Sequence, residues 1–334
     1  MDSQNEKIGF VLMNTGTPDS PDPADIKPYL IEFLSDPNLI HMPRALWLPI
    51  LHLFIARTRP KKTSPRYQQI WTPQGSPFML ESKAQEEGLN KRFEEAGISA
   101  VARLGMRYGN PSIDAALNEL EQLGCKKIIA FPLFPQTAFC TVKSCKGKIQ
   151  KTMRRHPNLQ LEKAIEGYHS NPGYVDALEA SIRDTWEYRP GSKLMFSFHS
   201  IPLSDVNAGD TYVEQARADV MQVAKRLGIP EEDWALAFHS RFEDPHAWVT
   251  PHPKAKLAEW AEQGITRVAM MTPGFSADCL ESLYDIQSVT CDYFKTLCMQ
   301  RGRQADVTYI PCLNHREDHL GLLFETAKQA LEDV

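Results

Sequence analysis

Short apolar runs alternate with longer, more polar segments along the whole chain, and this alternation constrains the fold more than any other feature. The apolar runs have the length of buried strands and cover residues 7–13, 101–106, 126–131, 159–165, 194–198, 234–238 and 267–272. The segments expected to be helical are 22–34, 82–96, 113–123, 141–156, 174–188, 211–227 and 254–263. Strands that alternate with helices form parallel sheets with helices on both faces, because each connection has to cross over the sheet. The sequence therefore predicts an α/β protein.

The same order of elements occurs in each half of the chain, which suggests two similar halves. The 334 residues suit two domains of about 150 residues each. We expect an N-terminal domain over residues 1–165, a C-terminal domain over 166–315 and a C-terminal helix over 316–334.

The composition is that of an ordinary globular protein, with 42% hydrophobic and 24% charged residues. A net charge of −5 argues against a nucleic-acid partner, which needs a basic face. No apolar run approaches the ~18 residues of a spanning helix, and the polar N-terminus does not resemble a signal peptide. The seven cysteines include no CxxC pair and favour a reducing compartment. We therefore expect a cytoplasmic protein, with peripheral contact at the inner membrane left open.

A histidine ends the apolar run 194–198 and is followed closely by a proline. Pro202 cannot donate a hydrogen bond to a sheet and helps to end the strand. His199 is therefore expected at the carboxyl edge of a central strand, where open α/β sheets bind ligands. A core histidine with one hydrogen bond is the alternative interpretation. A hydrolase that uses Ser200 with His199 is disfavoured, because adjacent residues of a strand point to opposite faces.

A second stretch rich in polar residues follows the strand at 267–272. Ser276 is a good N-cap for a helix. On that helix Asp278, Glu281 and Asp285 have i, i+3 and i+7 spacing and share one face. A solvated acidic face that complements the helix dipole is the alternative.

Loops that follow parallel strands open at the same edge of a sheet, so His199 and the start of the Glu281 helix are expected near one cleft. An imidazole and a carboxylate that face each other suit a divalent transition metal or a pair of proton acceptors. Two such groups are too few for a closed structural site. They suit an open site that hands its metal on.

Three loops of the first half also follow strands or precede helices. Asn14-Thr15-Gly16-Thr17-Pro18 ends the first strand, and Gly75-Ser76-Pro77 precedes a helix. Arg107 and Tyr108 follow another strand and are either a structural pair or a pair that faces a ligand.

Residues 39–56 are very apolar but are interrupted by Pro43 and Pro49. Basic residues follow: Arg57, Arg59, Lys61, Lys62 and Arg66. One interpretation is a core helix pair with a solvated basic end. The other is an apolar lip that holds a flat apolar ligand with carboxylates or touches a membrane surface.

Several of these stretches together resemble the ferrochelatase family and occur in its order. They are Asn14-Thr15-Gly16-Thr17-Pro18, Gly75-Ser76-Pro77, Arg107-Tyr108-Gly109, Phe131-Pro132-Leu133-Phe134-Pro135-Gln136, Phe198-His199-Ser200-Ile201-Pro202, Ser240-Arg241-Phe242 and Phe275-Ser276-Ala277-Asp278-Cys279-Leu280-Glu281. The resemblance implies two similar Rossmann-like halves around a porphyrin cleft. It implies a lyase that inserts Fe²⁺, as substrate, into a porphyrin to form haem.

The resemblance also implies roles for single residues. His199 becomes a metal ligand or the acceptor of pyrrole protons, and Glu281 the metal-binding group that faces it. Asp285 becomes the next member of an acidic row that passes metal inward, and Asp278 supports the cleft. The porphyrin-side positions are Thr15, Ser76, Arg107 and Tyr108. The stretch 46–55 resembles the lip of the cleft.

The chain also departs from the family pattern. Val289 occupies the third place of the acidic row, His239 stands where Gln is frequent, and Glu243 stands where Gly is frequent. The cysteine-bearing tail that holds an iron–sulfur cluster in eukaryotic members does not follow the last expected helix, so no such cluster is expected. Protoporphyrin IX is the expected substrate. There are three alternatives. The first is a chelatase that acts on coproporphyrin, and the second is a chelatase that loads cobalt or nickel into a smaller tetrapyrrole. The third is a non-catalytic carrier of porphyrin or haem.

Overall fold

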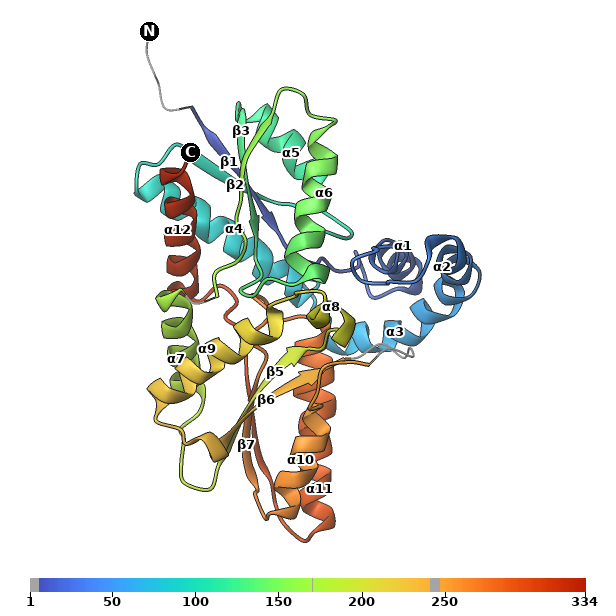
Figure 1. Cartoon of the computed structure of the whole chain (residues 1–334), viewed down its shortest axis with the longest axis vertical. Helices are drawn as coiled ribbons and strands as arrows, with labels where there is room; N and C mark the ends of the chain where they lie inside the picture. The colour runs from blue at the N-terminus through green and yellow to red at the C-terminus, as the bar shows by residue number, and fades with distance from the viewer. Residues whose placement is uncertain (1–5, 170, 241–246) are drawn as a thin grey trace. The chain divides into compact units, whose positions relative to one another are not determined.

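A computed structural model of the chain describes residues 6–169, 171–240 and 247–334 (Figure 1). Its strands are β1 Ile8–Met13, β2 Ala100–Leu104, β3 Lys127–Pro132, β4 Gln160–Ala164, β5 Lys193–His199, β6 Trp234–His239, β7 Arg267–Met271 and β8 Asp306–Ile310. Its α-helices are α1 Pro23–Leu34, α2 Arg44–Ile50, α3 Ala56–Ile70, α4 Pro77–Glu95, α5 Ile113–Gln122, α6 Ser144–Met153, α7 Pro172–Thr185, α8 Leu203–Asn207, α9 Tyr212–Leu227, α10 Pro253–Glu262, α11 Cys291–Gln300 and α12 Glu317–Glu332. Wider π-helical turns form η1 Leu51–Ile55, η2 Phe139–Lys143 and η4 Glu281–Thr290, and η3 Glu231–Asp233 is a short 3₁₀ turn.

The chain forms two compact units, each built on one parallel sheet of four strands. Unit 1 comprises residues 1–167 and 320–334, and unit 2 comprises residues 168–319. The strand order is β2-β1-β3-β4 in unit 1 and β6-β5-β7-β8 in unit 2, so both sheets place their strands in the same relative order. This topology confirms the predicted α/β fold of two similar halves.

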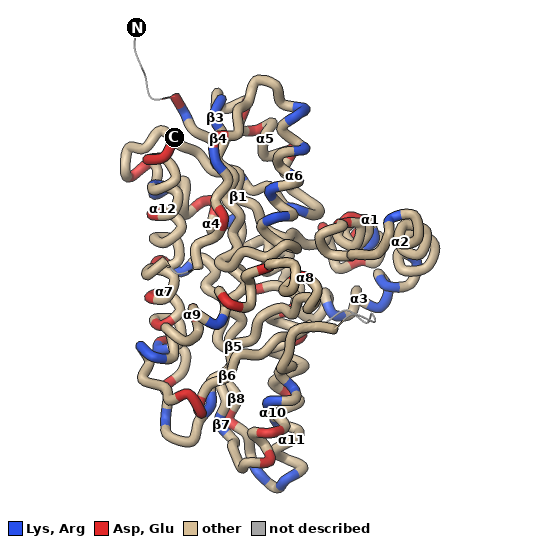
Figure 2. The backbone as a smooth tube through the Cα atoms, viewed as in Figure 1, with Lys and Arg blue, Asp and Glu red and all other residues tan. Residues whose placement is uncertain are grey.

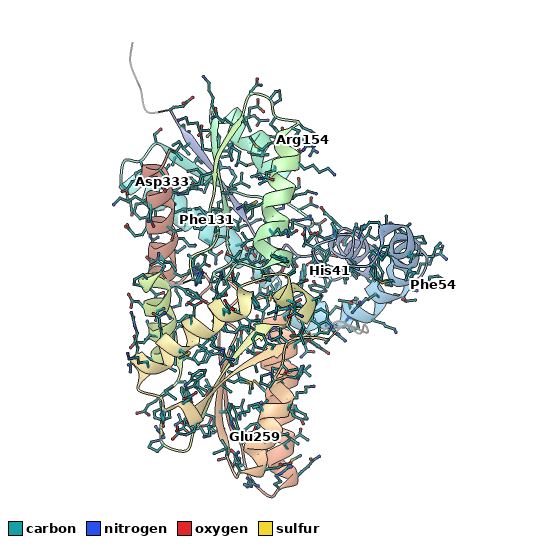
Figure 3. The ribbon with its side chains drawn as sticks, viewed as in Figure 1. His41, Phe54, Phe131, Arg154, Glu259 and Asp333 are labelled. Carbon is teal, nitrogen blue, oxygen red and sulfur yellow. The ribbon has the colours of Figure 1, made fainter. Side chains whose placement is uncertain are left out.

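Each unit has a hydrophobic core around the central strands of its sheet. In unit 1, β1 and β3 are buried almost throughout, and Figure 3 shows Phe131 in the interior between strands and helices. In unit 2, residues 194–198 of β5 are fully buried, as expected for a central strand with both faces covered.

The seven cysteines all lie in described segments and form no disulfide with one another. Burial raises the pKa of the Cys145 thiol to about 12, which keeps this thiol protonated.

The structure has elements that were not expected, among them α3 and α11, and two differences concern the second half of the chain. Strand β8 was not predicted, because only its last residue is buried and its sequence lacks a continuous apolar run. The helix that carries Glu281 begins at Glu281 and has π-helical turns, so Ser276 does not cap it and Asp278 lies before it. The i, i+3 and i+7 spacing therefore does not place these three carboxylates on one regular α-helix.

Candidate functional site

His199 is the last residue of β5, at the carboxyl edge of the unit 2 sheet. Its side chain is partly exposed, unlike the fully buried residues before it. Its Nδ1 lies 2.7 Å from the backbone carbonyl oxygen of Ser200. Because a carbonyl oxygen only accepts, Nδ1 is the donor and carries the proton of a neutral ring. The lone pair is then on Nε2, the nitrogen that is available to a proton or a metal.

His239 ends the neighbouring strand β6 and is the register partner of His199. The two ring centroids are 5.7 Å apart. His239 is only 2% exposed, and its Nδ1 lies 2.8 Å from Ser197 Oγ. Its Nε2 is buried and has no hydrogen-bond partner among the described residues. Burial, reinforced by His199 and His252, lowers the pKa of His239 well below its usual value, so this imidazole is neutral.

The segment after β7 lies against these two histidine-bearing strand ends. The Phe275 ring centroid is 5.8 Å from that of His239. At Gly274, an added Cβ would lie 3.0 Å from Phe198 Cδ1, so a residue without a side chain permits this close approach. The chain that leads into Glu281 is thereby held at the same edge of the unit 2 sheet as His199.

Asp278 ties this segment to the end of β8. Its carboxylate accepts hydrogen bonds from Ser282 Oγ at 2.8 Å, Tyr309 OH at 2.6 Å and Asn314 Nδ2 at 2.8 Å. Its own backbone N–H donates to Asn314 Oδ1 at 2.8 Å. The residue is 6% exposed, so these protein contacts occupy it and fix the approach to η4. The predicted roles of Asp278, support of the cleft and contact with a substrate, both stay predictions.

Glu281 and Asp285 are both half-buried and lie in the first turns of η4. In a helix with i to i+5 bonding, residues four or five apart share a face, so these two carboxylates lie along one side. Asp285 Oδ2 accepts a hydrogen bond from Ser240 Oγ at 2.9 Å. Ser240 has a φ of 55°, a strained value for a residue that is not glycine. The end of β6 is thereby linked to η4.

In unit 1, the loops after β1 and β2 are bound to each other through their backbones. The Tyr108 N–H donates to the Thr15 carbonyl oxygen at 2.9 Å. Gly16 has a φ of +104°, and an added Cβ would lie 1.9 Å from the Tyr108 carbonyl oxygen, so only glycine fits. Thr15 is half-buried beside it, and the buried Ser76 Oγ lies 3.2 Å from Thr17 Oγ1.

Arg107 and Tyr108 converge on Asp36, a buried carboxylate that the sequence did not single out. Arg107 Nη2 donates to Asp36 Oδ2 at 2.5 Å, and Tyr108 OH donates to the same oxygen at 2.7 Å. Ser144 Oγ also donates to that oxygen and accepts from Arg107 Nε at 2.6 Å. Burial alone would raise the pKa of Asp36, but the Ser144 hydrogen bond and the Arg107 charge outweigh it and lower the pKa. Of the two interpretations, these contacts favour the structural pair.

The apolar stretch 39–56 forms α2 and η1, and only part of it is core. Trp47 is buried, and its Nε1 donates to the Leu34 carbonyl oxygen at 2.7 Å. Leu46, Leu53 and Phe54 are 61%, 50% and 66% exposed. Figure 3 shows Phe54 at the outer end of this part of unit 1, pointing away from α1. Basic residues follow on α3, in blue in Figure 2, and four of them are exposed and have no ion-pair partner among the described residues: Arg57, Arg59, Lys61 and Lys62.

The sequence of this chain matches the ferrochelatase family over residues 7–331. The chain belongs to the ferrochelatase family. The ferrochelatase of Aromatoleum aromaticum is 37% identical over 98% of this chain and 89% of its own length. The ferrochelatase of Bordetella pertussis is 39% identical over 92% of this chain and 84% of its own length. Ferrochelatase 2 of Shewanella oneidensis is 36% identical over 97% of this chain and 98% of its own length.

Solved structures share the fold of this chain. SirB from Bacillus subtilis with Fe³⁺ aligns with a TM-score of 0.53 at 15% identity, over 75% of this chain and 88% of its own. The sirohydrochlorin chelatase SirB from Bacillus subtilis subspecies spizizenii, in complex with cobalt, aligns with a TM-score of 0.51 at 15% identity, over 79% of this chain and 93% of its own. At these identities the likeness concerns the fold.

Membership confirms the family resemblance and, with it, the prediction of a lyase that inserts iron into a porphyrin ring. It assigns no role to a single residue, so the predicted roles of His199, Glu281 and Asp285 stay predictions. Within the described ranges, no group of three or more His, Cys, Asp or Glu side chains could hold a metal ion. Glu243, Arg241 and Phe242 lie outside those ranges.

The sequence did not identify two side chains that bond residues at the two strand edges. Ser197 bonds His239 from within β5, and Asp36 bonds Arg107 and Tyr108 from the turn after α1. The first contact joins residues two positions out of register, because β5 pairs Ser197 with Ala237 and His199 with His239, so it depended on the strand pairing. Nothing in the sequence around Asp36 pointed to the second.

Proposed function

We propose that this member of the ferrochelatase family inserts Fe²⁺ into protoporphyrin IX, with His199 as the proton acceptor and Glu281 and Asp285 as the groups that deliver the metal. The reaction replaces two pyrrole N–H protons by one Fe²⁺, so two protons have to leave the ring. The observation that carries the proposal is the 2.7 Å contact of His199 Nδ1 with the Ser200 carbonyl oxygen. This contact leaves the Nε2 lone pair of a partly exposed imidazole free to accept a proton.

The two carboxylates of η4 supply the hard, negatively charged oxygens that attract a divalent cation. Ser240 holds Asp285 through a hydrogen bond. Asp278, which is bonded to Ser282, fixes the chain just before Glu281. With fewer than three ligands from the described residues, a cation would be held loosely enough to be passed on. In unit 1, Thr15 and Ser76 remain the proposed porphyrin contacts, while Arg107 and Tyr108 are proposed to act by shaping the loop beside Thr15.

The test is an anaerobic assay of iron insertion with purified variants. His199→Ala is expected to lower the rate at least about 100-fold, the usual scale for a lost acid–base group. Glu281→Gln is expected to lower it by a similar factor, because it removes a negative charge that attracts the cation. His315→Gln and Glu325→Gln, on the exposed residues His315 and Glu325, are the matched controls. Near-wild-type insertion by either site variant would refute the assigned roles. Porphyrin binding without any turnover by the wild type would favour the carrier instead.

The choice of protoporphyrin rests on the apolar stretch 39–56. Exposed Leu46, Leu53 and Phe54 suit a porphyrin with few carboxylates better than one with four. Parallel assays with protoporphyrin IX and coproporphyrin III are expected to give the higher kcat/KM for protoporphyrin. A preference for coproporphyrin would overturn this part of the proposal and leave iron insertion intact.

The same surface is proposed to contact an anionic membrane. Exposed apolar side chains lie next to four exposed cations that have no ion-pair partner in the described chain, a pattern typical of interfacial binding. No helix in the described ranges is both long and apolar enough to cross a membrane, so the proposed contact is peripheral. Sedimentation with phosphatidylglycerol vesicles should be strong at low salt and weak with phosphatidylcholine vesicles. Equal sedimentation with both would contradict the electrostatic part, and no sedimentation would contradict the contact itself.

A further inference from the structure

The pair of histidines at the ends of β5 and β6 suggests a second metal ligand. We propose that His239 Nε2 and His199 Nε2 together hold the incoming divalent cation before it enters the ring. Once the cation has left, the freed lone pair of His199 Nε2 accepts a pyrrole proton. This inference rests on the proposed function of the His199 edge and adds a residue to it. His239 is the register partner of His199 on the adjacent parallel strand, so both side chains leave the sheet on the same face.

The hydrogen bonds of the two rings follow one pattern. In each ring Nδ1 is held by the protein, through the Ser200 carbonyl oxygen in His199 and through Ser197 Oγ in His239. When Nδ1 of His239 donates to Ser197, the lone pair of His239 is on Nε2. A second nitrogen fixed by a hydrogen bond is the usual arrangement of histidines that bind metals.

The remaining polar atom of His239 has no hydrogen-bond partner in the described part of the chain. Its Nε2 is buried and forms no hydrogen bond to any described residue, although the side chain is only 2% exposed. Buried polar atoms are nearly always paired, so an unpaired one calls for an explanation. A cation at Nε2 would supply the missing interaction without breaking any hydrogen bond of the protein.

The spacing of the rings also fits a shared cation. Two imidazoles that bind one tetrahedral cation at Nε2–metal distances of about 2.1 Å have ring centres roughly 5 Å apart. The observed centroid separation is 5.7 Å. Ser240, which follows His239, donates to Asp285 Oδ2 at 2.9 Å and so joins the end of β6 to η4. Two nitrogens form an open site, in agreement with the lack of any cluster of three ligands among described residues.

The experiment is a titration of the porphyrin-free full chain with Co²⁺, whose visible absorption reports its ligands. His239→Gln replaces the imidazole by an amide that can still form a hydrogen bond with Ser197. The glutamine side chain has a volume similar to that of histidine. We expect this substitution to weaken Co²⁺ binding at least about tenfold and to change the absorption bands. His315→Gln removes an exposed imidazole and is expected to leave both readouts unchanged.

Unchanged Co²⁺ affinity and bands in a folded His239→Gln variant would overturn the proposal, whatever the iron-insertion assay shows for His199. X-ray absorption of the Co²⁺-loaded wild type provides a second measurement that needs no variant. Two imidazole ligands are expected in the scattering pattern. A pattern with a single imidazole would also overturn the role of His239, while iron insertion that depends on His199 would still stand.

Discussion

The hydroxyl of Tyr108 shows what a single residue contributes to the loop beside Thr15. Its hydrogen bond to Asp36 is buried, and Asp36 is ionised because Ser144 and Arg107 offset the cost of burial. A hydrogen bond to a buried charge contributes about 1.5–3 kcal/mol, so Tyr108→Phe should lower the free energy of unfolding by about that amount. Tyr293→Phe, on a residue without a described hydrogen bond, should change it by less than about 0.5 kcal/mol. Urea titration measures both, and equal effects would show that the Asp36 contact adds no stability.

At the scale of elements, replacing either of two glycines of unit 1 by alanine is expected to change the stability in opposite directions. Gly16→Ala would push a Cβ toward the Tyr108 carbonyl oxygen at a φ of +104°, so the loop has to move. Gly147 lies exposed inside α6 with nothing within 4 Å of an added Cβ. Gly147→Ala should therefore stabilise the protein by about 0.5–1 kcal/mol, and Gly16→Ala should destabilise it by more than about 2 kcal/mol. Thermal melts of both variants decide this, and a stabilised Gly16→Ala variant would show that the loop is not constrained as described.

Periodicity and strand-end position were enough to predict the central strands and the place of His199 at the end of one of them. A continuous apolar run such as that of β5 can only be buried on both faces, and its last residue has to lie at the sheet edge. Strand β8 has no such run, and the π-helical turns of η4 depend on contacts that spacing does not reveal. His239 was visible as a residue at a strand end, but its unpaired Nε2 depends on the ring orientation. Local pattern thus predicted the placement of residues, whereas their partners required the fold.

For the whole molecule, stability is expected to depend on pH through His319, the last residue of unit 2. His319 is fully buried, its Nδ1 donates to the Asn314 carbonyl oxygen at 2.7 Å, and its Nε2 lies 3.4 Å from Tyr168 OH. Burial lowers its pKa from 6.5 to about 4. Between these values the unfolded chain binds more protons than the folded one, so the free energy of unfolding falls as the pH falls.

As the pH falls, the loss of unfolding free energy through His319 should begin near pH 6.5 and end near pH 4. It should reach about 3 kcal/mol. His319→Asn keeps a donor for the Asn314 carbonyl oxygen but cannot titrate. We expect this variant to be less stable than the wild type at pH 7.5, with the difference shrinking toward pH 4. His315→Asn, on an exposed residue, should follow the wild type throughout. Denaturant midpoints across this range measure the effect. A constant gap between His319→Asn and the wild type would mean that the His319 imidazole is not held neutral, because its protonation would then cost the folded chain no more than the unfolded one.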